Sequence, residues 1–148
     1  MITEAGDDPQ VAGLVYVAAF APDQGQSVIG QNSQYPPTPG DTQFRPDASG
    51  FIMLTYQGVA EDFAQDLTPQ EKHLIFATQG QVSGPNEIEA LLTTAAWRQQ
   101  PDFYIVADQD RMIDPALEEQ IAEQMNATTI HISSSDHPDQ QAKLSDLR

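Results

Sequence analysis

The stretch "LVYVAAFAPDQGQS", Leu14 to Ser27, opens with eight small or apolar residues that run into Pro-Asp and a polar segment. The apolar character is continuous and does not alternate, which is typical of a strand in a parallel sheet with both faces covered. We therefore predict a strand within residues 11–21. Such a strand needs neighbours on both sides, yet only thirteen residues precede Leu14.

Its neighbours are expected near the C-terminus. "DFYIVAD" (102–108) is a run of strand-forming residues, and "ATTIHISS" (127–134) is a second one. Between them, "DPALEEQIAEQM" predicts a helix that Asp114 caps, with Leu117, Ile121 and Met125 as its buried stripe. Strand, helix and strand in this order favour a right-handed βαβ unit. The prediction is an α/β fold with a short, mainly parallel sheet of about three strands, followed by a weak helix over 137–148.

The segment between the first and second strands, about residues 23–100, is expected to be a helical, cap-like insert in a single domain of residues 1–148. Residues 23–49 contain "YPPTPG" and favour no regular structure. "GFIMLTYQG" (50–58) suggests a strand or hairpin arm. Three helices follow in the prediction. The first covers Val59–Leu67, and the second begins at the Thr68–Glu71 capping box, has Leu74, Ile75 and Thr78 on one face and ends at Gly80. The third covers 85–97, with Asn86 as its cap and Ile88, Leu91, Leu92 and Ala95 facing inward.

Composition excludes several classes of function. The 148 residues hold 22 Asp and Glu against 6 Lys and Arg, so the formal net charge is −16. A chain this acidic repels phosphates, which argues against nucleic acid and anionic membranes as partners. Cysteine is absent, and neither a membrane span nor a signal pattern is visible. We expect a cytoplasmic bacterial protein; the acidity is compatible with a salty habitat or with an ordinary acidic protein.

Carboxylates gather where the second strand should end, in "VADQDRMIDP" (106–115). Ligands and catalytic groups of α/β sheets collect at the carboxyl ends of strands, which makes Asp108 and Asp110 candidates; Asp114 is better explained as a helix cap. Their spacing resembles a calcium loop, but Ile113 stands where that loop needs glycine. We therefore expect no metal and no cofactor.

The sequence supplies an acid and a candidate base but no nucleophile motif. Its three histidines are His73, His131 and His137. No serine stands in Gly-x-Ser-x-Gly, the strained turn that exposes a hydrolase nucleophile, and no phosphate-binding or zinc motif occurs.

Several segments together resemble the small bacterial α/β-hydrolases. "ITEAGDDPQVAGLVYVAAFAPDQGQS" is similar to the region just after their nucleophile elbow. "RPDASGFIMLT" and "AEDFAQDLTPQEKHLIFATQ" resemble their cap, and "PDFYIVADQDRMIDPALEEQIAEQMNATTIHISSS" resembles their last strand–helix–strand unit. The resemblance covers nearly the whole chain and implies the C-terminal half of such an enzyme.

The resemblance places Asp110 at the position of the triad acid. The family's histidine follows "SSS" directly, whereas Asp136 stands there in this chain. Either His137 is displaced by one position, or the histidine segment is lost and His137 matches a later His-Pro. The resemblance also implies that the half bearing the nucleophile does not lie in this sequence.

From this we predict a hydrolase-like protein that is not catalytically competent alone, so whether it is an enzyme stays open. The first strand would lack one neighbour, and such an edge invites pairing with another chain. We expect a homodimer in which that strand pairs with its own copy through Leu14, Val15, Tyr16, Val17, Ala18 and Ala19. The alternative is a hydrolase subunit for small esters or amides that a separate N-terminal chain completes. A third reading is a partial gene product.

Overall fold

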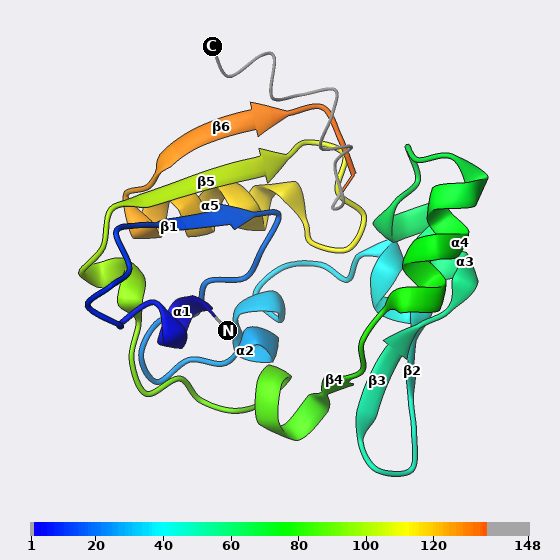
Figure 1. The fold of residues 1–148 in the computed structure, drawn as a ribbon, viewed down its shortest axis with the longest axis horizontal. Coiled ribbons are helices and arrows are strands. Elements are labelled where there is room, and N and C mark those ends of the chain that lie inside the picture. Colours follow the sequence, from blue (N-terminus) through cyan, green and yellow to red (C-terminus); the bar gives the residue numbers. More distant parts are fainter. Residues whose placement is uncertain (1, 136–148) are drawn as a thin grey trace.

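A computed structural model describes residues 2–135 and confirms the α/β class. Its main sheet is parallel with the strand order β1-β5-β6 (Figure 1). The strands are β1 (Leu14–Val17), β5 (Asp102–Ala107) and β6 (Thr128–Ile132), and helix α5 (Pro115–Met125) connects the last two. The three-strand parallel sheet predicted from the sequence is therefore present.

The insert lies beside this sheet and is more than a set of helices. It contains a small antiparallel sheet of the order β2-β3-β4, of which the sequence predicted only one strand or hairpin arm. Figure 1 shows this sheet under α3 and α4, away from β5 and β6. The remaining elements are α1 (Ile2–Ala5), α2 (Val28–Asn32), a 3₁₀ turn (Pro39–Gln43), β2 (Phe44–Pro46), β3 (Phe51–Leu54), α3 (Tyr56–Gly58), a π turn (Val59–Phe63), α4 (Pro69–Thr78), β4 (Val82–Ser83), a π turn (Gly84–Ile88) and a 3₁₀ turn (Ala96–Arg98). No helix within residues 2–135 is long and apolar enough to cross a membrane.

Helix α5 packs on one face of the parallel sheet and builds the core. Asp114 caps it by accepting the Ala116 N–H at 2.9 Å, as predicted. Leu117 and Ile121 are fully buried against the side chains of Tyr16 and Tyr104. The two tyrosine rings stack with centroids 6.1 Å apart. The apolar stripe read from the sequence therefore lies where a sheet-covering helix needs it.

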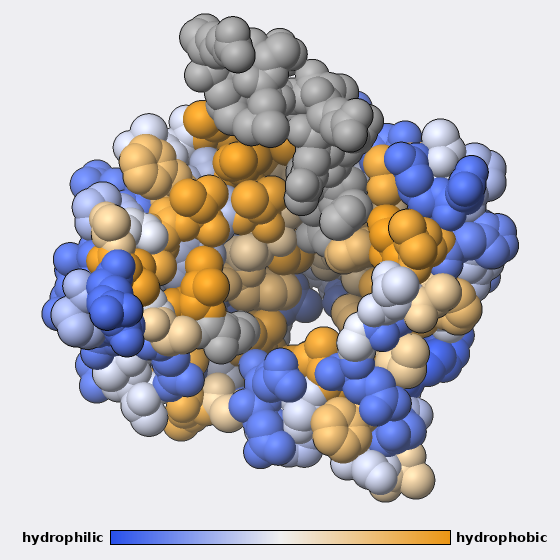
Figure 2. Space-filling view, in the orientation of Figure 1, coloured by the Kyte–Doolittle hydropathy of each residue, from blue (hydrophilic) through white to orange (hydrophobic). Residues whose placement is uncertain are grey.

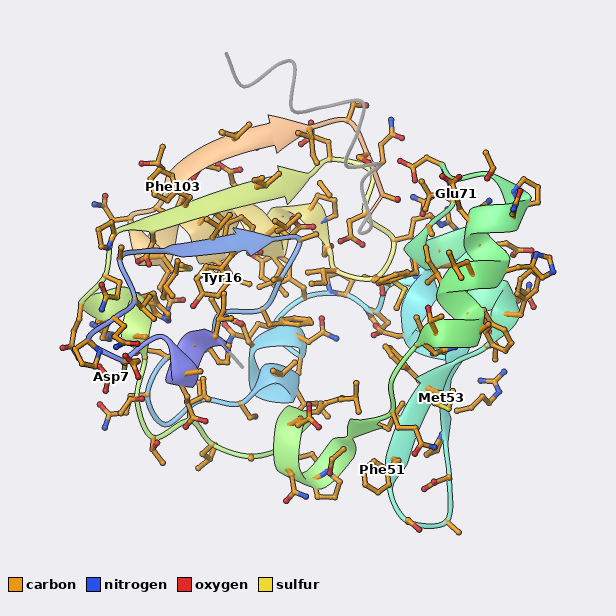
Figure 3. The ribbon with its side chains drawn as sticks, in the orientation of Figure 1. Asp7, Tyr16, Phe51, Met53, Glu71 and Phe103 are labelled. Carbon is orange, nitrogen blue, oxygen red and sulfur yellow. The ribbon has the colours of Figure 1, made fainter. Side chains whose placement is uncertain are left out.

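The opposite face of the sheet is exposed, so the prediction that the first strand is buried on both faces is wrong for the described residues. Val15 is 56% exposed and Val17 38%, and the neighbouring strands add Phe103 at 44% and Ile130 at 36%. We call these four side chains the bare sheet face. Figure 2 shows apolar side chains gathered on this face, and Figure 3 labels Phe103 on it and Tyr16, which belongs to the core. Within residues 2–135 no helix covers it (Figure 1).

Strand β1 ends at Val17 because the chain turns sharply there. Ala18 has a φ of 42°, in the left-handed region that residues other than glycine rarely adopt. The Tyr104 hydroxyl holds the turn: it donates to the Ala19 carbonyl at 2.5 Å and accepts the Ala19 N–H at 3.1 Å. The apolar run that predicted a longer strand therefore continues past the strand itself and enters the core as a loop.

Two predicted features of the insert are wrong. The helix expected over 85–97 is only a π turn that ends at Ile88, and Leu91, expected to face inward, is 66% exposed, whereas Leu92 and Ala95 are buried as predicted. Helix α4 does begin at the predicted capping box, but none of its residues is buried, and Leu74 is 63% exposed. Local capping signals placed this helix correctly, whereas its short apolar stripe did not indicate burial.

Candidate functional site

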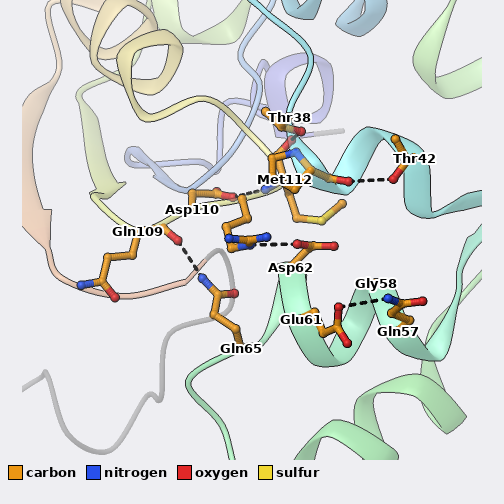
Figure 4. Close-up of polar contacts among 12 residues, drawn as sticks. Thr38, Thr42, Gln57, Gly58, Glu61, Asp62, Gln65, Gln109, Asp110 and Met112 are labelled. Atoms are coloured by element: carbon orange, nitrogen blue, oxygen red, sulfur yellow. Dashed lines mark hydrogen bonds and ion pairs between the residues drawn. The ribbon is translucent and has the colours of Figure 1, made fainter.

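Asp110 lies just after the carboxyl end of β5 and is nearly buried, at 7% exposure. Its Oδ1 accepts the backbone N–H of Met112 at 2.6 Å (Figure 4) and that of Ile113 at 3.0 Å. These two bonds shape the connection to α5 and fix the direction of the carboxylate. A carboxylate that accepts backbone N–H groups is stabilised in its charged form. Asp110 is thus an acid with a fixed orientation at the carboxyl edge of the sheet, where α/β folds bind ligands.

The insert is tied to this same connection by polar contacts. The Arg111 side chain donates to Asp62 at 2.8 Å, and Asp62 is buried. Gln65 donates to the carbonyl of Gln109 at 2.7 Å (Figure 4). Because these contacts reach the residues on either side of Asp110, the insert and the acid are held together.

A third contact joins the insert to the end of β6. Asp66 accepts the Ser134 hydroxyl at 2.8 Å, the Ser135 hydroxyl at 2.5 Å and the Ser135 N–H at 3.2 Å. Both serines are fully buried. Asp66 therefore fixes Ser134 and Ser135, the residues that follow β6 and precede His137 in the sequence. His137 itself, like the predicted final helix, lies outside the described residues, so its place relative to Asp110 stays a prediction.

The other two histidines have partners of their own. His131 Nδ1 lies 2.9 Å from Asp108 Oδ1 and its Nε2 lies 3.0 Å from Glu119 Oε2. The hydrogen bond to Asp108 raises the pKa of His131. His73 Nδ1 contacts the Tyr56 hydroxyl and the Pro69 carbonyl. The structure thus pairs the candidate Asp108 with His131, and both side chains are about half exposed.

Glu118, on α5, is a buried acid that was not among the candidates predicted from the sequence. It is fully buried, and its Oε2 accepts the Ala107 N–H at 3.0 Å. Burial raises the pKa of Glu118 to about 9, and the neighbouring Asp110 adds to the increase. On a helical wheel Glu118 lies beside Leu117 and Ile121, on the buried side of α5, which is the one signal that could have found it.

An apolar cavity of about 510 Å³ lies between the insert and the β5–α5 connection, which contributes Met112 and Ile113. Phe20, Val59, Phe63, Leu54 and Met112 are among its lining side chains. Met112 is also a residue whose N–H binds Asp110, so the cavity borders the connection that carries the candidate acid. A space of this size with mostly apolar walls suits a small apolar molecule.

A second hollow, of about 620 Å³, follows the free edge of β1. Val15, Tyr16 and Val17 line it together with Ile2 and Thr3 of α1. In the described part of the chain no strand pairs with this edge, so its backbone groups face the hollow.

The carboxylates of the β5–α5 connection are engaged with protein groups. Asp108 contacts His131, Asp110 accepts two backbone N–H groups, and Asp114 caps α5. Residues 2–135 contain no group of three His, Asp or Glu side chains arranged to hold a metal ion.

The chain belongs to the alpha/beta hydrolase family, whose sequence pattern it matches over residues 1–146. Among solved structures it is similar to a pyrethroid hydrolase from Sphingobium faniae, with a TM-score of 0.71 and 18% identity. It is also similar to polyneuridine aldehyde esterase, with a TM-score of 0.58 and 15% identity. No curated protein matches the sequence.

These likenesses show the fold and its extent. The alignment covers 99% of this chain but 62% of the pyrethroid hydrolase, and 86% of this chain but 56% of the esterase. The chain thus spans about 60% of the length of these structures and is a partial α/β-hydrolase fold, as the sequence resemblance predicted.

Proposed function

We propose that this chain is the cap-bearing and acid-bearing part of an α/β-hydrolase, that it is inactive as the isolated 148-residue chain, and that it self-associates through β1. The bare edge of β1 carries the proposal. An exposed strand edge is a template for another strand, and proteins usually cover or charge it. Here the edge carries Val15 and Val17, has no charged side chain within Leu14–Val17, and borders the bare sheet face.

A two-fold dimer would use both features at once. An isologous contact places the same patch on each copy, so β1 can pair antiparallel with its own copy and join two parallel sheets into one. The hollow beside β1 is wide enough to receive side chains of a partner. The net charge of −16 on each copy opposes this contact. Because salt screens such repulsion, added salt should strengthen the dimer.

Self-association is tested by light scattering at tens of micromolar protein, in 0.15 M and 1 M salt. A dimer that tightens with salt supports the proposal. A monomer in both buffers removes it.

The inactivity of the isolated chain rests on its inventory of groups. A serine hydrolase needs a nucleophile, a base and an orienting acid, together with donors for the oxyanion. This sequence supplies Asp110 for the acid, and His137 for the base by resemblance, but no Gly-x-Ser-x-Gly. We expect no turnover of p-nitrophenyl acetate by the purified chain. Turnover that disappears in Asp110→Asn would contradict the proposal.

A second candidate function is a hydrolase subunit for small esters or amides that a separate N-terminal chain completes. The matched structures are longer than this chain, and the apolar cavity of about 510 Å³ beside Met112 offers room for a small substrate. A serine-reactive fluorophosphonate probe separates the two candidates. Labelling of a reconstituted complex, but not of this chain alone, favours the second.

A further inference from the structure

Glu118 lies next to the β5–α5 connection that carries Asp110. It projects from the first turn of α5, is fully buried, and binds the end of β5 because its Oε2 accepts the Ala107 N–H at 3.0 Å. Its other oxygen, Oε1, is also buried, and among residues 2–135 no donor faces it. A buried carboxylate oxygen without a donor is costly, because water no longer solvates its charge.

The charged groups that act on Glu118 are both acids. The Asp110 carboxylate lies within reach of a side-chain hydrogen bond to it, and Asp108 acts from the same connection. Two ionised carboxylates in contact repel each other and have no proton to share, so a hydrogen bond between them requires that one is protonated. Burial and these two neighbours all raise the pKa of Glu118.

Of the two carboxyl groups, Glu118 is the one expected to hold the proton, because more N–H groups bind Asp110. Asp110 Oδ1 accepts two backbone N–H groups, which stabilise its ionised form, whereas Glu118 accepts one. We propose that Glu118 is a neutral acid that donates a hydrogen bond to Asp110 and fixes the orientation of that carboxylate. Glu118 is thus a positioning residue. A role of Glu118 in catalysis rests on the function proposed for Asp110, but the protonation of Glu118 does not.

Three variants of the full chain test the proposal. Glu118→Gln keeps the shape, an acceptor for the Ala107 N–H and a donor toward Asp110. Glu118→Ala removes all three. Glu123→Gln makes the same chemical change at an exposed position of the same helix and is the matched control.

The first measurement is stability against pH by urea unfolding. The folded-state pKa of Glu118 lies above the unfolded value of 4.5, so the folded chain holds one more proton between about pH 4.5 and 9. Its contribution is therefore fully present below pH 4.5 and is lost as the pH rises, by about tenfold in the folding constant per pH unit. Glu118→Gln should lack this decline between pH 6.5 and 8.5, relative to wild type. Glu123→Gln should keep it.

The second measurement is exchange of the Met112 and Ile113 amide protons, which bind Asp110. Glu118→Ala should accelerate their exchange at least tenfold, whereas Glu118→Gln should keep the slow exchange of the wild type. If the alanine variant fails to fold, the pH dependence of Glu118→Gln and of its control Glu123→Gln still shows whether Glu118 carries the proton. A carbon-13 titration that finds Glu118 ionised at pH 7, or the proton on Asp110, would overturn the proposal. An inactive reconstituted hydrolase with Glu118 protonated would instead remove only the function proposed for Asp110.

Discussion

The substitution Val15→Lys tests whether the bare sheet face drives association. Val15 keeps 56% of its surface exposed. Full burial of a valine contributes about 1.5 kcal/mol, so completing the burial of Val15 would contribute roughly 0.8 kcal/mol per copy and about 1.7 kcal/mol per dimer. That difference corresponds to roughly a 15-fold change in Kd. A lysine buried at the contact would add to the loss, and lysine is a residue that natural sheets use to block edge pairing.

The matched control is Leu74→Lys. Leu74 is 63% exposed on α4, in the insert and away from the parallel sheet, so the control makes the same charge change at an equally exposed apolar site. Sedimentation equilibrium in 0.5 M salt measures both Kd values. Neither substitution should change the free energy of unfolding of the monomer by more than about 0.5 kcal/mol. An unchanged Kd for Val15→Lys, or an equal loss for Leu74→Lys, would refute the reasoning.

Three further substitutions probe the core and the acid groups. Ile121→Ala removes a fully buried side chain and should lower the free energy of unfolding by about 2–5 kcal/mol in urea; less than about 1 kcal/mol would mean that α5 is not packed as described. Asp66→Asn should lower the free energy of unfolding by about 1 kcal/mol and speed exchange of the Ser135 amide proton. Unchanged exchange would mean that Asp66 does not hold the Ser135 N–H as described. Burial raises the pKa of Asp102 to about 6, so its stabilising contribution is present below pH 3.8 and is lost as the pH rises through 6. Asp102→Asn should therefore be more stable than wild type above pH 6, by about 1 kcal/mol after solvent screening, and equal pH profiles would argue against the shift.

The parallel sheet and α5 were predictable because their signals are local and agree with one another. Asp114 and Pro115 mark the helix start, and Leu117, Ile121 and Met125 mark its buried side. Capping also placed α4. Burial of α4 was not predictable, because a short apolar stripe does not reveal whether another element lies opposite it. The uncovered face of β1 was missed for the same reason, since a run such as "LVYVAAF" looks alike whether or not a helix covers it.

Of the candidate site, the sequence predicted Asp110 by resemblance and by its place after a strand. It did not predict Glu118, because a glutamate inside a helix is usually solvated and its burial depends on how α5 rotates against the sheet. The contacts of Asp62 and Asp66 were equally hidden. They join residues far apart in the sequence, and only the packing of the insert brings them to the β5–α5 connection and to Ser134.

The register of the parallel sheet also bears on how quickly the chain folds. Leu14 pairs with Asp102 and Val17 with Ile105, so most of the sequence lies between the two paired strands. Closing so large a loop costs entropy before any pairing energy is returned, and each doubling of loop length adds about 0.6 kcal/mol. The hairpin of Phe44–Pro46 with Phe51–Leu54 and the unit from Asp102 to Ile132 need only short loops and should form first. We expect docking of β1 to be the slow step. Until it occurs, β5 would offer its own unpaired edge to other chains, so the refolding yield should depend on protein concentration.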